Sequence, residues 1–246
     1  MQKSVVVIPT YNSKRTIKKL VEKVLQYLPK IKIVVVDDSS PDGTANEIKK
    51  YFAKDRRITL IVKERKGGRG SAVIQGFQEG LKDKKVKFLI EMDSDLCHNP
   101  KYIPAMIKKC KEYDVVIASK YLKESKIIGL PFKRILFSKT VNLFIRFMLG
   151  IPITDYTNGF RCYKRKTLET LSFSQVRSKG FIVLSEIAFI IHKKKFLFSE
   201  MPFDFKFEDK NPSNLNFSEM REAFFTILRL KLSDLFIQLQ ELAVEK

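Results

Sequence analysis

The sequence has few cysteines, few residues typical of unstructured chains, and no long apolar run. Its three cysteines are too few and too scattered for a disulfide framework or a zinc ligand set, so we expect a reducing, cytosolic setting; they are Cys97, Cys110 and Cys162. Only 10 glycines and 9 prolines occur, and 44% of residues are hydrophobic, which excludes a disordered or fibrous chain. No stretch of about 18 apolar residues is present, and the chain opens on a strand-like run. We therefore expect neither a membrane-spanning helix nor a signal peptide.

Positive charge is what the sequence has in excess. The 47 Lys and Arg residues against 27 Asp and Glu residues give a formal net charge of +20. Such a charge fits a nucleic acid, an anionic membrane or a phosphate-bearing substrate. The length of 246 residues suits one domain, or one domain with an appendage.

The first half alternates short apolar runs with helical patterns, which predicts an α/β fold of parallel strands joined by helices. The expected strands are 4–8, 31–36, 57–62, 86–92 and 114–118. The expected helices are 14–28, 43–53, 70–81 and 100–110. The Val- and Ile-rich strands indicate burial on both faces, and the polar clusters fall just after strands, where ligands bind open α/β sheets.

The second half is less regular. The pattern predicts helices at 132–149 and 181–192 and a strand at 203–207. From residue 218 onward, apolar residues recur at helical spacing and predict a C-terminal amphipathic helix.

An acidic pair follows the fourth expected strand. Asp93 and Asp95 stand one residue apart, and two such carboxylates can hold a hard cation such as Mg²⁺ or Mn²⁺ that also takes phosphate oxygens. The alternative is that Asp95 caps the next helix.

Two further clusters follow the second and first strands. Asp37 and Asp38 can accept hydrogen bonds from a base or ribose, while the nearby Asp42 and Thr44 suit a turn and a helix start. After the first strand, Tyr11 can line a nucleotide pocket.

A basic glycine-rich loop spans 66–71. Backbone N–H groups in such a loop can cradle a diphosphate, although it matches neither the NTPase loop nor the dinucleotide fingerprint, and an ordinary loop is the alternative. Together the clusters at successive strand ends predict a site for a nucleoside diphosphate.

The order of these motifs resembles glycosyltransferase family 2, and within it the polyprenyl (dolichyl) phosphate mannose synthases. The resemblance covers roughly residues 4 to 215. The strings that carry it are Pro-Thr-Tyr-Asn from residue 9, Asp-Asp-Ser-Ser-Pro-Asp-Gly-Thr from 37, the loop at 66–71, Met-Asp-Ser-Asp-Leu-Cys-His-Asn-Pro from 92, Ala-Ser-Lys-Tyr from 118, Ser138, Asn142, Asp-Tyr-Thr-Asn-Gly-Phe-Arg from 155, Lys-Gly-Phe from 179, Glu186 and Glu-Met-Pro from 200.

The resemblance implies a GT-A type nucleotide-sugar-binding fold with a mostly parallel central sheet flanked by helices. It implies an inverting transfer of mannose from GDP-mannose to polyprenyl (dolichyl) phosphate, with Mg²⁺ or Mn²⁺ held by Asp93 and Asp95. Asp95 would act in catalysis. The substrate-binding residues that it implies are Pro9, Tyr11, Asn12, Asp37, Asp38, Lys66, Gly70, Asp93, Glu186 and Lys206.

The acceptor phosphate needs cations more than it needs a base. A phosphate monoester with a second pKa of about 6 is largely dianionic at neutral pH, so its oxygen is already a nucleophile. Arg134, Arg146 and Arg161 are the candidates for positioning it, because guanidinium groups suit phosphate oxygens. The alternative for Arg134 and Arg146 is a solvated helix face. His98 and His192 are expected to be surface or packing residues.

The chain also departs from the family pattern. Ser13 stands where Glu is usual, and Cys97 follows the acidic pair, where it would be a poor ligand for Mg²⁺. The family's late basic pattern is lost, and Lys206 or Lys210 would have to replace it; the residues found there are Glu208, Asn211, Ser213 and Asn214.

A polyprenyl tail keeps the reaction at a membrane, since exposing each CH₂ to water costs about 0.8 kcal/mol. We expect a peripheral protein at the cytoplasmic face of an anionic membrane, with a catalytic domain at 1–215, an interfacial helix at 132–149 and a C-terminal helix at 216–246 that lies in the interface, packs on its own domain or forms a homodimer. Whether a separate membrane subunit exists stays open.

Within enzymes, the alternative donor is UDP-glucose or a UDP-amino sugar. From another class, the alternative is a basic nucleic-acid-binding or scaffold protein, although the sequence lacks the aromatic interleaving of nucleic-acid-binding motifs.

Overall fold

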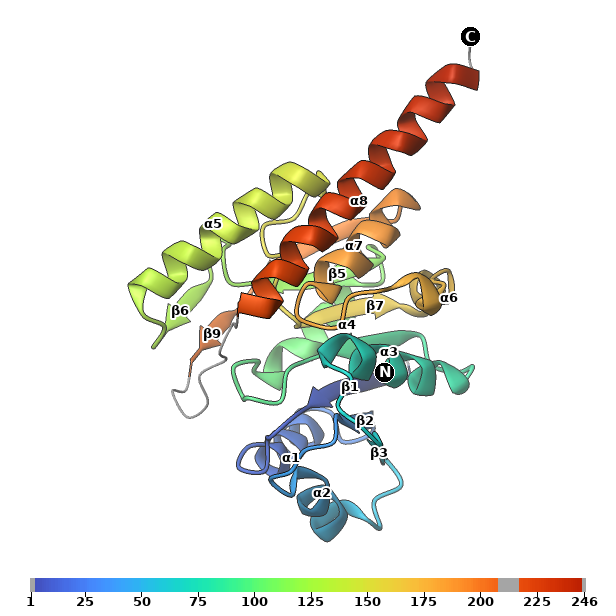
Figure 1. Cartoon of the computed structure of the whole chain (residues 1–246). Coiled ribbons are helices and arrows are strands. Elements are labelled where there is room, and N and C mark those ends of the chain that lie inside the picture. Colours follow the sequence, from blue (N-terminus) through green and yellow to red (C-terminus); the bar gives the residue numbers. More distant parts are fainter. Residues whose placement is uncertain (1–2, 208–216, 245–246) are drawn as a thin grey trace.

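A seven-stranded sheet with helices on both faces forms the centre of the molecule (Figure 1). The computed structural model describes residues 3–207 and 217–244, with side chains up to residue 240. The strand order is β3-β2-β1-β4-β7-β5-β8, and a two-stranded sheet pairs β6 with β9. The strands are β1 (Ser4–Thr10), β2 (Lys32–Asp37), β3 (Ile58–Val62), β4 (Phe88–Glu91), β5 (Val115–Ser119), β6 (Lys126–Ile128), β7 (Arg161–Lys164), β8 (Phe198–Pro202) and β9 (Asp204–Lys206).

The connecting helices cover the sheet as the hydrophobic pattern predicts. They are α1 (Ile17–Tyr27), α2 (Thr44–Phe52), α3 (Arg69–Lys82), α4 (Ile103–Lys109), α5 (Phe132–Leu149), α6 (Arg165–Glu169), α7 (Val183–Lys193) and α8 (Phe217–Val244), with 3₁₀ turns at Pro100–Tyr102 and Phe173–Gln175. Alternate residues of each strand face opposite cores. Val5 and Val7 of β1 join the core formed with α3 and α7, whereas Val6 and Ile8 join the core formed with α1 and α4. This double burial explains the continuous apolar runs.

The predicted α/β fold with a mostly parallel sheet is confirmed. β1, β2, β3 and β4 pair in parallel, as do β5 and β8, and only β7 runs antiparallel, between β4 and β5. The prediction missed β6, β7 and β8. The sequence of β7 has charged residues at both ends, so no apolar run marks it, and β8 is a half-buried edge strand. The strand expected at 203–207 is the short β9, because β8 already ends at Pro202.

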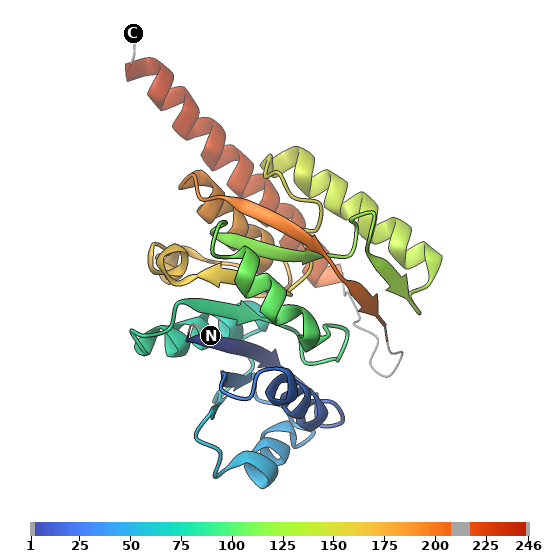
Figure 2. The same cartoon turned by 180° about the vertical axis from the view of Figure 1, so that it is seen from behind.

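The long helix α8 contacts α5 and α7, and its last turns extend beyond the rest of the molecule (Figures 1 and 2). The expected domain boundary near residue 215 lies outside the described residues. Over the part of the chain that the structure describes, none of the helices combines the length and the apolar character needed to cross a bilayer.

Candidate active site

The carboxyl ends of β1, β2, β4 and β5 lie at the same end of the sheet, so the loops that follow these strands meet there. We call this end the carboxyl edge, and the antiparallel β7 begins at it. The loops are cross-linked by hydrogen bonds: the Ser13 hydroxyl lies 2.7 Å from that of Ser94, and the Asn12 amide donates to Ser40 Oγ at 2.9 Å. Ser13, where the family usually has Glu, thus connects the loops after β1 and β4.

The two aspartates after β2 organise the backbone around them. Asp37 accepts from the Ser40 amide at 3.0 Å and its hydroxyl at 2.5 Å. Asp38 accepts from the amides of Gly67 and Gly68 at 2.9 and 2.8 Å, and Lys63 Nζ lies 2.6 Å away. Both carboxylates are buried. In this structure they hold the loops after β2 and β3 through hydrogen bonds to the backbone, and the contacts with a base or ribose expected of them stay a prediction.

The outer rim of this half of the site is exposed. Tyr11 is 40% exposed, and Lys66 Nζ lies 3.8 Å above the centre of its ring. Asn12 adopts a left-handed backbone with φ of 55°, while Pro9 is buried within β1. Tyr11 and Lys66 therefore present an aromatic face and a cation on the exposed side of these loops.

The expected role of Gly70 as a phosphate-binding amide is not supported. Its N–H donates to the Lys179 carbonyl at 2.8 Å, and a Cβ on Gly70 would lie 2.4 Å from the Ser178 carbonyl oxygen. The amides of Lys179 and Gly180 donate in turn to Glu222 of α8, at 2.6 and 3.1 Å. Gly70 is needed for close packing between the glycine-rich loop and the 177–180 segment.

An arginine sits against the acidic residues at the end of β4. Arg69 Nη2 lies 2.7 Å from Glu91 Oε1 and 2.6 Å from Asp93 Oδ1. Glu91 is fully buried. Burial disfavours the charged form of Asp93, but Arg69 and His98 outweigh it, so the pKa of Asp93 is lowered. Burial also raises the pKa of Glu91 despite its pairing with Arg69.

His98 and Gly159 hold the acidic loop in place. His98 Nδ1 accepts from the Asp93 amide at 3.0 Å, its Nε2 lies 2.7 Å from Asn158 Oδ1, and its ring stacks on Phe160. A Cβ on Gly159 would lie 2.1 Å from Arg69 Nη2 and 2.9 Å from Asp93 Oδ1. The expected packing residue His98 is thus also a hydrogen-bonding support for Asp93.

Asp95 is exposed and accepts one hydrogen bond, from the Cys97 amide at 3.0 Å. It does not cap the following helix, since Asn99 fills that position. Cys97 is buried. Among the described residues, no three His, Cys, Asp or Glu side chains gather closely enough to form a metal site. The donor set of two carboxylates fits Mg²⁺ or Mn²⁺, which complete their shells with water and phosphate oxygens.

A cationic hollow lies beside α5. It has a volume of about 190 Å³ and is lined by Tyr121, Lys139, Asn142, Leu143, Arg146 and Thr154. Next to it, the Tyr121 hydroxyl donates to Ser138 at 2.5 Å, and the buried Lys120 pairs with Asp155 at 2.9 Å. Burial lowers the pKa of Lys120, but Asp155 outweighs it, so the pKa is raised and the ammonium stays charged.

The three arginines expected at the acceptor phosphate lie in different environments. Arg146 is exposed and lines the hollow. Arg134 is half-buried, with its guanidinium 5.1 Å from the Phe207 ring centre. Arg161 is fully buried, and its guanidinium donates to the backbone carbonyls of Asn158, Tyr156 and Leu184. Its expected role at the phosphate is therefore corrected to a structural one.

Glu186 also has a structural role. It is buried, accepts from the amides of Arg177 and Ser178, and pairs with Arg229 of α8. This network leaves it no part in substrate binding. Lys206 is exposed on β9. The altered late motif (Glu208, Asn211, Ser213, Asn214) and Lys210 lie outside the described residues.

Sequence reasoning missed Arg69 and Lys120 as site residues. Lys120 belongs to the quoted Ala-Ser-Lys-Tyr string, and Arg69 to the basic loop, but only the fold shows that both side chains reach buried carboxylates. The sequence also did not predict the role of Glu200, which accepts hydrogen bonds from the amides of Thr154 and Asp155.

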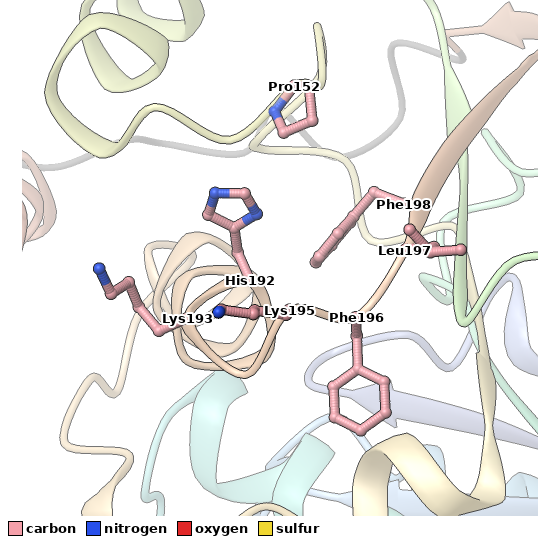
Figure 3. Close-up of a pocket in the computed structure, with 7 residues that line it drawn as sticks. All are labelled: Pro152, His192, Lys193, Lys195, Phe196, Leu197 and Phe198. Atoms are coloured by element: carbon pink, nitrogen blue, oxygen red, sulfur yellow. The ribbon is translucent and has the colours of Figure 1, made fainter.

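A larger hollow of about 470 Å³ lies away from this edge, at the start of β8 (Figure 3). His192, on the last turn of α7, and Phe198 face each other with ring centres 6.2 Å apart, and Pro152 lies above them. Its lining has no carboxylate, and Phe198 pairs with Val115 at the opposite end of β5 from the loops described above.

Comparison with known proteins shows the family to which the chain belongs. The glycosyl transferase family 2 model matches residues 5–172. The chain is a member of glycosyltransferase family 2. A polyprenol monophosphomannose synthase of Mycolicibacterium smegmatis is 34% identical, over 92% of this chain and 86% of the relative. An undecaprenyl-phosphate mannosyltransferase of Micrococcus luteus is 30% identical, over 91% of each.

Solved structures show the same fold. Glucosyl-3-phosphoglycerate synthase from Mycobacterium tuberculosis, in complex with Mn²⁺, UDP and glucosyl-3-phosphoglycerate, superposes with a TM-score of 0.69 at 15% identity, covering 93% of this chain and 80% of that one. The family 2 enzyme described here thus has the expected GT-A type fold.

Proposed function

We propose that this family 2 glycosyltransferase moves mannose from GDP-mannose to the phosphate of a polyprenyl lipid. The observation that carries the proposal is the similarity over more than nine-tenths of the chain to two relatives named for polyprenyl phosphate mannose transfer. An acidic pair and a cationic hollow in the same molecule support it.

Asp93 and Asp95 would hold the divalent ion, which when bound would offset the charge that develops on the departing nucleoside diphosphate. The protein contributes the orientation of Asp93, through its contacts with Arg69 and His98. Asp95 is exposed and free to turn toward a ligand. Arg69 and His98 hold Asp93 and not Asp95. We therefore propose that the divalent ion approaches the pair from the side of Asp95.

The nucleotide would lie against the ends of β1 and β2. Asp37 and Asp38 shape this pocket through their backbone contacts, while Tyr11, Asn12 and Lys66 form its exposed rim. Lys66 would then lie within reach of the diphosphate as a mobile cation.

The acceptor phosphate would enter the hollow lined by Lys139 and Arg146. A phosphate dianion attacks the anomeric carbon without help from a base, and attack from the face opposite to the leaving diphosphate inverts the configuration. The two cations and the Tyr121 side chain would position the phosphate. Their exposure keeps this binding moderate, so the phosphate oxygen stays nucleophilic.

Helix α5 would place this hollow at a membrane. The side of α5 that faces solvent carries Phe132, Leu143 and Phe147, each at least 68% exposed. The cations on the same helix are Lys133, Arg134, Lys139 and Arg146. Exposed apolar side chains accompanied by Lys and Arg are typical of helices that lie in the interface of an anionic bilayer.

The proposal is tested by following a labelled sugar from each of several donors onto polyprenyl phosphate by thin-layer chromatography. We expect labelled lipid from GDP-mannose in the presence of Mg²⁺ or Mn²⁺. If labelled lipid forms only with UDP-glucose or a UDP-amino sugar, that sugar nucleotide is the donor instead of GDP-mannose. No labelled lipid from any donor would contradict the proposed function.

A further inference from the structure

Helix α8 carries a leucine repeat that its own domain does not cover. Leucine stands at positions 228, 232, 235, 239 and 242, spaced alternately by four and three residues. This spacing averages 3.5 residues and is the repeat of the seam in a coiled coil. The side chains of the first four are 37%, 57%, 41% and 64% exposed. We call Leu228, Leu232, Leu235 and Leu239 the leucine seam.

The leucine seam lies on the side of α8 that faces away from the domain. Ile227 and Leu230 are buried in the core shared with α7, and Asp234 pairs with Lys193 of α7. At 100° per residue, the mean direction of positions 227, 230 and 234 lies about 140° around the helix from that of 228, 232, 235 and 239. A second helix can therefore lie along the seam without displacing α8 from its own domain.

The position of α8 leaves room for this second helix. Both views show its last turns extending past α7 and α5, with no other described element around them (Figures 1 and 2). A helix that extends beyond its domain with a row of exposed leucines exposes apolar surface that a monomer in water leaves uncovered.

The charges of α8 favour a helix over a lipid surface as the occupant. Residues 232–244 contain no Lys or Arg, whereas interfacial helices are rich in both, as α5 is. The positions that flank the seam in this half are Phe236 and Gln238; at its start they are Lys231 and Arg229, of which Arg229 pairs with Glu186 of α7. From residue 232 onward two identical helices thus meet through apolar and neutral side chains, with no row of like charges to repel them.

We propose that α8 pairs along the leucine seam with α8 of a second copy of this chain, so that the protein is a homodimer. The pairing buries the seam between two helices and leaves each domain on the outer side. It does not depend on the proposed sugar donor or acceptor.

Sedimentation equilibrium of the full chain, without detergent or lipid, tests the proposal between about 1 and 100 µM. We expect a species of twice the 28.6 kDa chain mass. Leu232→Glu with Leu239→Glu would bury four carboxylates in the pair, and we expect the dissociation constant to rise about 100-fold or more. The matched control, Ser233→Glu with Gln240→Glu, adds the same charges to exposed positions about 120° around the helix from the seam and should stay dimeric.

Circular dichroism of both variants checks that the helix content is unchanged, since neither alters the buried face of α8. A monomeric wild-type protein over the whole concentration range would overturn the proposal without any variant. Dimerisation unaffected by the seam substitutions, or lost equally in the control, would also overturn it. A monomer in solution whose seam variant loses binding to vesicles would assign the seam to lipid instead.

Discussion

Arg69 Nη2 lies 2.6 Å from Asp93 Oδ1, so the first residue of α3 holds the first carboxylate of the acidic pair. The same nitrogen lies 2.7 Å from the fully buried Glu91. Burial acts to lower the pKa of Arg69, but Asp93 and Glu91 have the larger effect and raise this pKa above its ordinary value. The guanidinium therefore stays charged. The acidic pair is thus built on an internal ion pair that sequence motifs do not reveal.

The first prediction concerns this ion pair. Arg69→Gln leaves Glu91 buried without its counter-charge, and we expect a loss of about 3 to 5 kcal/mol in the free energy of unfolding. Arg69→Met combined with Glu91→Met removes both buried charges and should recover most of that loss. Urea unfolding of the three proteins measures it. A single variant within about 1 kcal/mol of wild type would contradict the ion pair.

The second prediction concerns Asp95. Asp95→Asn should reduce kcat/KM for transfer by about 100-fold or more, because a neutral amide is a poor ligand for a hard cation. The fold should be intact, since the residue is exposed and the amide oxygen can still accept from Cys97. Asp83→Asn, which alters a carboxylate paired with Lys3 and Lys32 at the opposite edge of the sheet, is the matched control. Unchanged turnover in the Asp95 variant would remove it from the site.

The third prediction separates acceptor binding from donor binding. Arg146→Gln removes a cation from the hollow beside α5, and we expect KM for polyprenyl phosphate to rise about 10-fold while KM for the donor changes little. Lys133→Gln, on the same helix but outside the lining of the hollow, should leave both constants near wild type. A rise in the donor KM instead would place Arg146 with the nucleotide.

The fourth prediction tests α5 as the membrane-binding helix. Vesicles with anionic lipid should bind the protein, and added salt should release it. Leu143→Glu with Phe147→Glu places negative charge on the exposed side of α5 and should abolish binding, whereas Leu197→Glu, at an exposed site before β8, should not. Co-sedimentation measures the bound fraction. Equal binding to neutral and anionic vesicles at low salt would contradict the electrostatic contribution to membrane binding.

The fifth prediction is a pH dependence. Burial raises the pKa of Asp114, but the Leu197 amide and two lysines, Lys164 and Lys166, outweigh it, so the pKa lies below the ordinary 3.8. A lowered folded-state pKa stabilises the fold above pH 3.8, and this contribution is lost as the pH falls through the folded value. Asp114→Asn should cost about 1 to 3 kcal/mol at neutral pH and progressively less below pH 3.8. A constant difference across this range in urea unfolding would contradict the assignment.

The sequence predicted the parts of the fold and site that depend on local pattern. Apolar runs located β1 and β2, and the polar residues that follow them do lie at one edge. It did not predict β7, which has no apolar run, or the partners of Arg161, which are backbone carbonyls supplied by distant segments. A sequence shows where a charged residue stands, but only the tertiary structure shows which groups accept its hydrogen bonds.

The contact of Glu222 with the 179–180 amides joins the tail helix to the segment that packs against the glycine-rich loop. Glu222 of α8 accepts from Lys179, whose carbonyl in turn accepts from Gly70, the residue after Arg69. Hydrogen bonds therefore run from α8 through Lys179 to Gly70, beside the arginine that contacts Asp93. Replacing the Glu222 carboxylate would leave the Lys179 and Gly180 amides without this acceptor, so the packing of the 177–180 segment against the start of α3 depends on the tail helix.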